Sequence, residues 1–273
     1  MIPAKFDYEV AESVDHAIEL LGSGPDAKLL AGGHSLLPLM RLRLARPELL
    51  VDVGRLGELS YVREDGDAVA IGALTRYHDL ERSDVLRAAC PILASAAGGV
   101  GDPQVRHRGT IGGSVAHCDP ASDVPTILLA LDAELVVRGP EGERRLPVAE
   151  SFGGFLTTAL GPQEVLTEIR VPATRDAGWS YQKHTRRAQD WATVGVAAVR
   201  ANGGARVALT NMGATALRAS GVEEALSSGS DPAAAAERAA EGTSPPSDHN
   251  ASTEFRQHLA RVFTRRALEE ALA

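Results

Sequence analysis

The stretch Leu30-Ala-Gly-Gly-His-Ser-Leu-Leu-Pro38 decides how the rest of this 273-residue chain is interpreted. It follows an apolar run, 27–30, that predicts a short buried strand, and it leads into 36–44, which predicts a short helix or turn. Two adjacent glycines can adopt backbone conformations that are closed to other residues. Successive N–H groups can then point into one concavity and bind an anion, assisted by the positive end of the following helix. The stretch is therefore a candidate pyrophosphate site, and an ordinary strand-to-helix turn is the alternative.

A second glycine pair, Thr110-Ile-Gly-Gly-Ser114, repeats the pattern later in the chain. Two such loops could hold one diphosphate from opposite sides, with backbone N–H groups and the hydroxyls of Ser35, Thr110 and Ser114 as donors. Neither stretch contains lysine or arginine, so peptide dipoles would have to balance the phosphate charge. The repetition favours a diphosphate site over two unrelated turns.

Composition excludes several classes of protein. The net charge of −8 leaves no basic surface typical of nucleic-acid binding. No apolar run reaches the ~18 residues needed to cross a bilayer, and the N-terminus lacks the features of a signal peptide. We therefore expect a cytoplasmic protein without a transmembrane segment; a peripheral position at the inner membrane face is the alternative.

Two cysteines, Cys90 and Cys118, are too few to ligate an ordinary iron–sulfur cluster, and they form no C-x-x-C pair. We expect no disulfide in a reducing compartment. The triplet His117-Cys118-Asp119 resembles a metal site, but adjacent residues on regular structure cannot all face one ion, so we expect a packed loop instead. If the protein handles electrons, the carrier is an organic cofactor or lies on a partner chain.

Periodicity and turn residues predict an α+β chain in two domains, 1–172 and 173–273, with a boundary near 172–178. The first domain divides into α/β parts at about 1–54 and 55–172. Its helices are expected at 13–22, 77–82, 84–89, 92–98 and 123–131, with Asp123 as the cap of the last; its strands at 27–30, 49–53, 61–63, 68–71, 133–138, 143–146 and 165–171. The second domain is expected to have strands at 179–183, 193–200 and 205–211 and helices at 217–226, 232–240 and 252–272.

Four groups of residues, in this order, carry a resemblance to a known family. They are Ala31-Gly-Gly-His-Ser35, Arg106-His-Arg-Gly-Thr-Ile-Gly-Gly-Ser114, Asp119-Pro-Ala-Ser-Asp123, and Tyr181-Gln-Lys183 with Arg187 and Asp190-Trp-Ala192. Together they resemble the flavoprotein (medium) subunit of molybdenum-containing hydroxylases, with the medium subunit of bacterial carbon monoxide dehydrogenase and the flavin domain of xanthine dehydrogenase as the nearest members. The resemblance covers almost the whole chain.

The resemblance implies a fold and a role. The fold has two α/β subdomains of the PCMH/vanillyl-oxidase type that clasp noncovalent FAD, followed by a C-terminal domain of three strands packed with helices. In this family a large partner oxidises the substrate at a molybdenum–pterin centre, and a small partner carries two [2Fe-2S] clusters. The flavin subunit passes the electrons to an external acceptor (a quinone, NAD or another), and the assembly is a dimer of heterotrimers. The lack of cluster cysteines agrees with this division.

The resemblance also implies a set of cofactor-binding residues, with no catalytic residue and no metal ligand in this chain. They are Leu30, Ala31, Gly32, Gly33, His34, Ser35, Leu36, Val100, Thr110, Ile111, Gly112, Gly113, Ser114, Asp123, Leu166, Lys183 and Trp191.

Several of these residues have ordinary structural alternatives. Asp123 matches a family carboxylate that contacts the cofactor, and a helix cap would also explain it. Lys183 and Trp191 match positions near the flavin ring, where the lysine would favour anionic reduced flavin and the tryptophan would cover a ring face; a surface lysine and a core tryptophan are the alternatives. The segment Arg106–Arg108 either shapes the approach to the adenosine or ribityl side or is a solvated turn.

His34 raises the question of covalent attachment. In some flavin oxidases with a similar Gly-Gly-His turn the histidine is joined to the flavin, whereas the subunits resembled here bind FAD noncovalently. The chain has no Ser-His-Asp arrangement, Walker sequence or G-x-G-x-x-G fingerprint, so NAD would be a diffusible acceptor. Two other functions stay open: a stand-alone flavin oxidase, and a non-enzymatic nucleotide-binding module.

Overall fold

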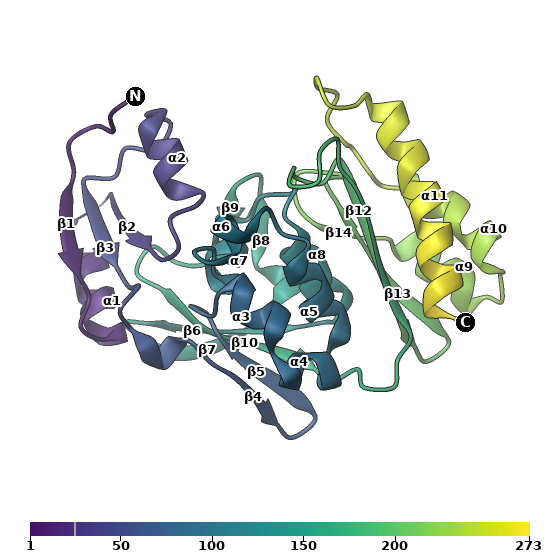
Figure 1. Ribbon diagram of the computed structural model, residues 1–273, viewed down its shortest axis with the longest axis horizontal. Helices are drawn as coiled ribbons and strands as arrows, with labels where there is room; N and C mark the ends of the chain where they lie inside the picture. Colours follow the sequence, from purple (N-terminus) through teal and green to yellow (C-terminus); the bar gives the residue numbers. More distant parts are fainter. Residues whose placement is uncertain (25) are drawn as a thin grey trace.

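Three larger β-sheets follow one another along the described chain, and each packs against a cluster of buried apolar side chains (Figure 1). The computed structural model describes residues 1–24 and 26–273. A part with a parallel sheet comes first, a part with an antiparallel sheet and helices comes second, and a sheet with helices on its outer face follows; the prediction of an α/β second part was wrong, because all its strand pairs are antiparallel. This order agrees with the predicted α+β architecture.

The first part is a parallel sheet with strand order β1-β3-β2. Its elements are β1 (Asp7–Val10), α1 (Val14–Gly22), β2 (Ala27–Leu30), α2 (Leu36–Arg41) and β3 (Leu49–Asp52). The Ser13 hydroxyl accepts a hydrogen bond from the His16 amide at 3.0 Å, as expected of the N-cap of α1. The sequence did not predict β1, because its side chains are mostly exposed and show no apolar alternation.

The second part is built on an antiparallel sheet with strand order β4-β5-β10-β6-β7. Its strands are β4 (Val62–Asp65), β5 (Ala68–Gly72), β6 (Glu134–Gly139), β7 (Gly142–Pro147) and β10 (Val165–Pro172), with a small pair β8 (Phe152–Gly154) and β9 (Thr157–Thr158). Its helices are α3 (Tyr77–Arg82), α4 (Asp84–Ala89), α5 (Pro91–Gly98), α6 (Pro103–Arg106), α7 (Ile111–His117) and α8 (Asp123–Ala130), with short 3₁₀ turns at Gly57–Leu59 and Val148–Glu150. The helices gather on one face of the sheet (Figure 1).

The C-terminal part is a sheet with strand order β11-β12-β13-β14. Its elements are β11 (Trp179–His184), β12 (Val194–Ala201), β13 (Gly204–Thr210), β14 (Leu217–Arg218), α9 (Ser220–Ser227), α10 (Pro232–Ala236), a 3₁₀ turn at Glu237–Ala240, and α11 (Thr253–Ala271). The three predicted strands are present as β11, β12 and β13, and the prediction missed β14, because residues 217–218, expected to begin a helix, pair with β13 instead. A two-residue strand is too short to show alternation.

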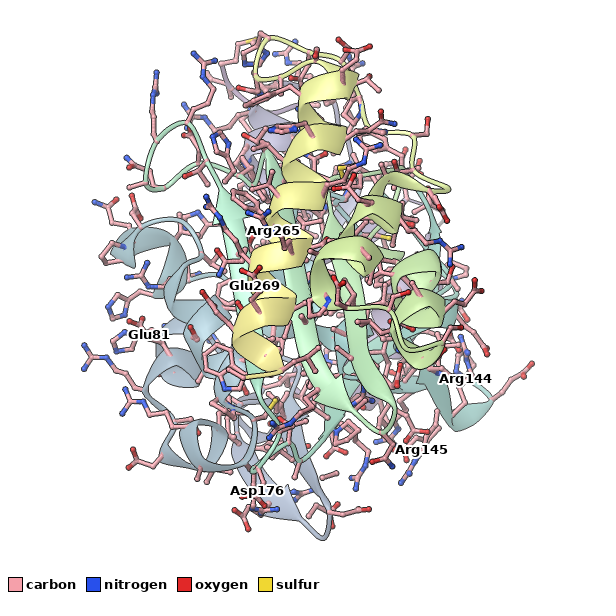
Figure 2. The ribbon with its side chains drawn as sticks, turned by 90° about the vertical axis from the view of Figure 1, so that its right-hand side faces the viewer. Glu81, Arg144, Arg145, Asp176, Arg265 and Glu269 are labelled. Atoms are coloured by element: carbon pink, nitrogen blue, oxygen red, sulfur yellow. The ribbon has the colours of Figure 1, made fainter. Side chains whose placement is uncertain are left out.

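The C-terminal sheet lies between α8 on one side and α11 on the other (Figure 1). Figure 2 shows α11 running across the outer face of the sheet, with Arg265 and Glu269 on its outer side. Within the described ranges, no helix has both the length and the apolar composition needed to span a membrane.

Candidate functional site

The first glycine pair follows β2 and needs glycine for two different reasons. A β-carbon on Gly32 would lie 2.2 Å from the carbonyl oxygen of Arg108, so the chain can approach that segment closely only without a side chain. Gly33 has a φ of +79°, in the left-handed region that favours glycine. The first glycine therefore permits a contact and the second permits a turn.

The amides of this turn are available to a ligand. In the part of the chain that the structure describes, none of the N–H groups of 32–36 donates a hydrogen bond, and the Ser35 hydroxyl makes no capping bond. The amide of Leu37 is the first to be used, and it donates to the Gly33 carbonyl at 3.0 Å. A row of free amides ahead of a helix is the donor set that a phosphate group requires.

The second glycine pair differs from the expected loop, because Ile111–His117 forms helix α7. The amides of Ile111 and Gly112 donate to the carbonyls of Thr75 and Ala73 at 3.0 and 2.9 Å, and the Gly113 amide donates to Thr110 Oγ1 at 3.2 Å. The prediction that these backbone N–H groups point freely at a diphosphate was therefore wrong. A β-carbon on Gly112 would lie 2.7 Å from the Ala73 carbonyl oxygen, so this glycine serves packing.

Gly113 is the glycine of the second pair that faces solvent. A β-carbon there would meet only the Thr110 hydroxyl, at 2.8 Å, among the described atoms. The hydroxyl of Thr110 accepts from the Gly113 amide and keeps its own proton to donate, and Ser114 is half-buried beside it. This stretch therefore offers hydroxyl donors and an open surface, whereas the first offers amides.

The sequence suggested that Asp123 caps its helix, but the structure shows that it does not. Ser122 is the N-cap residue, and Asp123 is the first residue of α8, 6% exposed. Its Oδ1 accepts a hydrogen bond from the Tyr181 hydroxyl at 2.5 Å, and its Oδ2 pairs with Lys183 Nζ at 2.7 Å. Burial raises the pKa of Asp123, and the neighbouring ammonium group opposes that rise.

Lys183 joins three elements of the structure. Besides Asp123 on α8, its Nζ donates to the carbonyl of Gly99 at the end of α5, at 3.3 Å, while the residue itself lies on β11. Its side chain is 14% exposed, so it is not an ordinary surface lysine. Val100, half-buried, is next to Gly99, so the structure gathers Val100, Asp123 and Lys183 at one place.

Tyr181 was missed as a candidate site residue, although it belongs to the Tyr-Gln-Lys triplet. Residues two apart on a strand share one face of the sheet, so this spacing could have indicated that Tyr181 and Lys183 reach the same partner. Burial and the charge of Asp123 raise the pKa of Tyr181 well above its usual value, so it stays a hydrogen-bond donor. Leu166, by contrast, lies on β10 and is buried in the central core.

Trp191 is not a core tryptophan. It is 59% exposed and lies in the segment between β11 and β12. The side-chain amide of Asn211 donates to the next carbonyl, that of Ala192, at 2.8 Å and holds the segment in place. His34 is also exposed. Both side chains are therefore accessible to a ligand or a partner.

The segment 106–108 is ordered by contacts on three sides. Arg106 pairs with Glu81 at 3.1 Å, and the ring of His107 stacks on that of His78 with centroids 3.9 Å apart. Arg108 is exposed, and its carbonyl is the group against which Gly32 packs. These contacts bring the first glycine pair against the segment that leads into the second.

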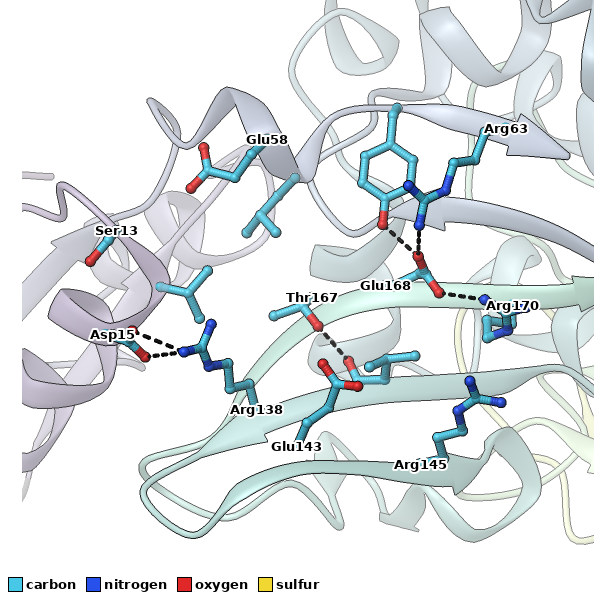
Figure 3. A pocket seen from close by; sticks show the side chains of 14 residues that line it. Ser13, Asp15, Glu58, Arg63, Arg138, Glu143, Arg145, Thr167, Glu168 and Arg170 are labelled. Carbon is cyan, nitrogen blue, oxygen red and sulfur yellow. Dashed lines mark hydrogen bonds and ion pairs between the residues drawn. The ribbon is translucent and has the colours of Figure 1, made fainter. Parts of the chain in front are cut away.

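A cavity of about 530 Å³ lies elsewhere, on the face of the five-stranded sheet opposite the helices (Figure 3). Glu168 at its wall accepts hydrogen bonds from Tyr61 at 2.6 Å and from Arg63 and Arg170 at 3.2 and 3.0 Å. None of its described lining residues belongs to the predicted site. Its charges largely neutralise one another, so it is a polar junction between α1 and the sheet.

Comparison with known proteins identifies the family. The family described as "FAD binding domain in molybdopterin dehydrogenase" matches residues 4–174, and "CO dehydrogenase flavoprotein C-terminal domain" matches residues 179–271. The chain belongs to the FAD-binding subunits of the molybdenum hydroxylases.

Relatives cover the chain from end to end. The carbon monoxide dehydrogenase medium chain of Hydrogenophaga pseudoflava is 44% identical over 284 residues, which cover 100% of this chain and 99% of that one. A solved structure of carbon monoxide dehydrogenase from the same organism matches with a TM-score of 0.96 and 45% identity, covering 100% of this chain and 99% of its counterpart. A putative xanthine dehydrogenase FAD-binding subunit of Escherichia coli (strain K12) is 30% identical over 280 residues, 97% of this chain and 96% of that one.

These matches confirm three of the predictions from sequence: the family, the fold class and the assignment to oxidoreductases that use FAD. The relatives are named for different substrates, carbon monoxide and xanthine among them, at comparable coverage. Membership of this FAD-binding subunit family therefore does not name a substrate.

Substituting glycines should separate the effect of the turn on stability from the effect of an added side chain on FAD binding. We expect Gly113→Val to lose FAD at only a small loss of stability, because the new side chain covers an open surface and its β-carbon meets only the Thr110 hydroxyl, which must shift. Gly33→Val should lose FAD and also about 1–2 kcal/mol of stability, because its φ is positive. Flavin absorbance and urea unfolding measure both effects. Gly57→Val is the control, since a β-carbon there meets no described atom within 4 Å. If both site variants kept their full flavin content, the two glycine pairs would be ordinary turns that do not bind FAD.

The buried pair predicts a pH-dependent effect of Lys183→Met. Burial raises the folded-state pKa of Asp123 above its unfolded value, so the stability contributed by its protonated form is present at low pH and is lost as the pH rises through the folded pKa. Above that pKa the ionised carboxylate depends on Lys183, and removing the ammonium should cost about 3 kcal/mol. At lower pH the carboxyl takes up a proton and the loss should shrink.

Urea unfolding at pH 8 and pH 5 measures this difference. Lys5→Met, at an exposed position, is the control and should change stability little at either pH. Adding Asp123→Asn to Lys183→Met should recover much of the loss at pH 8. An equal loss at both pH values would assign the effect to packing instead of charge.

Proposed function

We propose that this chain is the electron-transfer flavoprotein subunit of a molybdenum hydroxylase-type dehydrogenase. It receives electrons from [2Fe-2S] clusters on a partner subunit and passes them through noncovalent FAD to an external acceptor. The observation that carries the proposal is the row of free amides at 32–36, which lies against the segment leading into the second glycine pair, in a chain that matches the family along its length.

The residues of the site divide the work of binding. The amides of 32–36 and the hydroxyls of Ser35, Thr110 and Ser114 hold the diphosphate, and Gly113 leaves room for its approach. When bound, FAD would supply a redox centre able to exchange electrons one or two at a time. Lys183, fixed by Asp123, supplies a positive charge near the ring, and exposed Trp191 covers part of it.

The remaining members of the predicted set extend this site: Leu30, Ala31, His34, Leu36, Val100, Ile111, Gly112 and Leu166. We also retain the division into a flavin-binding domain, 1–172, and a C-terminal domain, 173–273. The His34 side chain stays unattached in this proposal, since membership of a noncovalent family favours a dissociable cofactor.

The assembly has a large molybdopterin-binding subunit and a small [2Fe-2S] subunit beside this chain. The relatives' names, "medium chain" and "FAD-binding subunit", support a multi-subunit complex. A dimer of heterotrimers about a two-fold axis is the expected form, since two-fold closure is the commonest symmetry. The acceptor is a diffusible quinone, NAD or another small oxidant.

Acid precipitation tests the mode of FAD attachment. We expect a yellow supernatant and a colourless pellet, because acid unfolds the site and releases a dissociable cofactor. Absorbance of both fractions is the measurement. A yellow pellet would show covalent attachment, through His34 in the first place, and His34→Ala would then release the flavin. A protein with no flavin in either fraction would contradict the proposed function.

Co-expression with candidate large and small subunits tests the electron route. The chain should co-purify with both, together with molybdenum and iron, and substrate should reduce its FAD only within the complex. Rapid-mixing absorbance of the flavin is the measurement, with the isolated chain as the control. Dye reduction by the isolated chain and a substrate would instead support a stand-alone flavin oxidase.

A further inference from the structure

The segment that follows the first glycine pair is an exposed surface of mixed apolar and basic character. Leu37, Leu42 and Leu44 are 41%, 54% and 74% exposed. Arg41, Arg43 and Arg46 are exposed among them. We call residues 37–46 the arginine-leucine segment. A single exposed leucine needs no explanation, but several in ten residues mark a surface that another molecule covers.

The arginines of this segment are not engaged by carboxylates of the chain. Within residues 1–24 and 26–273 none of the three takes part in an ion pair, although many other arginines do. The whole chain has a net charge of −8, yet this segment contains no acidic residue. A partner surface complementary to this segment would have an apolar patch that covers the leucines and acidic residues around it that pair with the arginines. Arginine is also enriched in protein interfaces.

Backbone geometry at Arg43 adds an independent observation. Its φ is +59°, a left-handed conformation just past the end of α2 where glycine is the usual residue. Its Nε donates to the carbonyl of Ile2 at 3.3 Å, which brings another exposed apolar residue beside the segment. Figure 1 shows α2 and the N-terminus together at one end of the molecule, far from α11.

The surface is continuous with the flavin-binding turn. The amide of Leu37 donates to the Gly33 carbonyl at 3.0 Å, and a β-carbon on Gly33 would lie 2.9 Å from Leu37 Cδ1. A molecule that covers Leu37 would therefore also restrain the turn whose amides are free.

We propose that the arginine-leucine segment is the docking surface for an acidic-rimmed apolar patch on a partner subunit of the complex. This proposal rests on the proposed function, since it requires an assembly. A second copy fits poorly, because a two-fold interface would set arginines against arginines. A bilayer fits poorly as well: α2 has six residues, the segment has no aromatic side chain, and an anionic membrane would repel a chain of charge −8.

Two double variants test the docking surface: Arg41→Glu/Arg46→Glu and Leu42→Ser/Leu44→Ser. The chain is co-expressed with the molybdopterin-binding and [2Fe-2S] subunits, and sedimentation gives the dissociation constant of the complex. We expect each variant to bind at least tenfold more weakly, while the isolated chain keeps its FAD content and melting temperature. Raising the salt concentration should weaken the wild-type complex more than the charge-reversed one. Arg265→Glu, on the outer side of α11 (Figure 2), is the control and should stay within twofold.

The other outcomes decide against the proposal. Wild-type affinity in both variants would overturn it. The proposal would also be overturned if the variants kept the complex intact but lost a self-association that the wild-type chain shows. The same holds if they kept the complex but lost a binding to phosphatidylserine vesicles that the wild-type chain shows. A wild-type chain that forms no complex at all would contradict the proposed function itself, which separates that failure from a failure of the docking surface alone.

Discussion

The close approach of two backbone segments, at Gly32 and at the carbonyl of Arg108, is the contact on which the rest of the structure depends. A β-carbon on Gly32 would lie 2.2 Å from the carbonyl oxygen of Arg108. Any residue other than glycine would therefore push the part that contains β1 to β3 away from the part that follows it. Gly112 repeats this role inside the second part, against the carbonyl of Ala73. The contact at Gly32 brings the first glycine pair against the segment that leads into the second pair, where the first pair offers backbone amides and the second offers the hydroxyls of Thr110 and Ser114.

Charge is distributed around this site in an unusual way for a protein that binds a diphosphate. Neither glycine stretch carries a cation, and the chain as a whole is acidic. The lysine of the predicted set is Lys183, whose ammonium group is held by Asp123 and by the carbonyl of Gly99 at the end of α5. Since that pair is buried, its position is fixed by packing of the C-terminal sheet on α8. The arginines of the arginine-leucine segment are exposed, and within the described residues they form no ion pair.

Prediction from sequence succeeded where the signals are local. The bounds of α3 and α4 agree with the prediction, and α1 begins after its serine cap, because capping residues and apolar periodicity act within one or two turns. Helix α7 was missed, since two glycines in its first turn weaken helix propensity. The carbonyls of Thr75 and Ala73, far away in sequence, accept its first amides and stabilise it. The same limit explains why the contacts of Asp123 were not predicted, because its hydrogen-bond partners lie 58 and 60 residues away in the sequence.

The sequence by itself determined the family, the α+β fold class, the two glycine pairs and the absence of enough cysteines for a cluster, because residue identity and order carry all of these. Only the tertiary structure decided how the glycines divide their tasks. Whether an amide is free for a ligand depends on which carbonyl lies opposite it, and that depends on the packing of β5, α7 and the turn after β2. The second pair uses its amides within the chain, while the first leaves its amides open. The sequences of the two pairs are too similar to distinguish these roles.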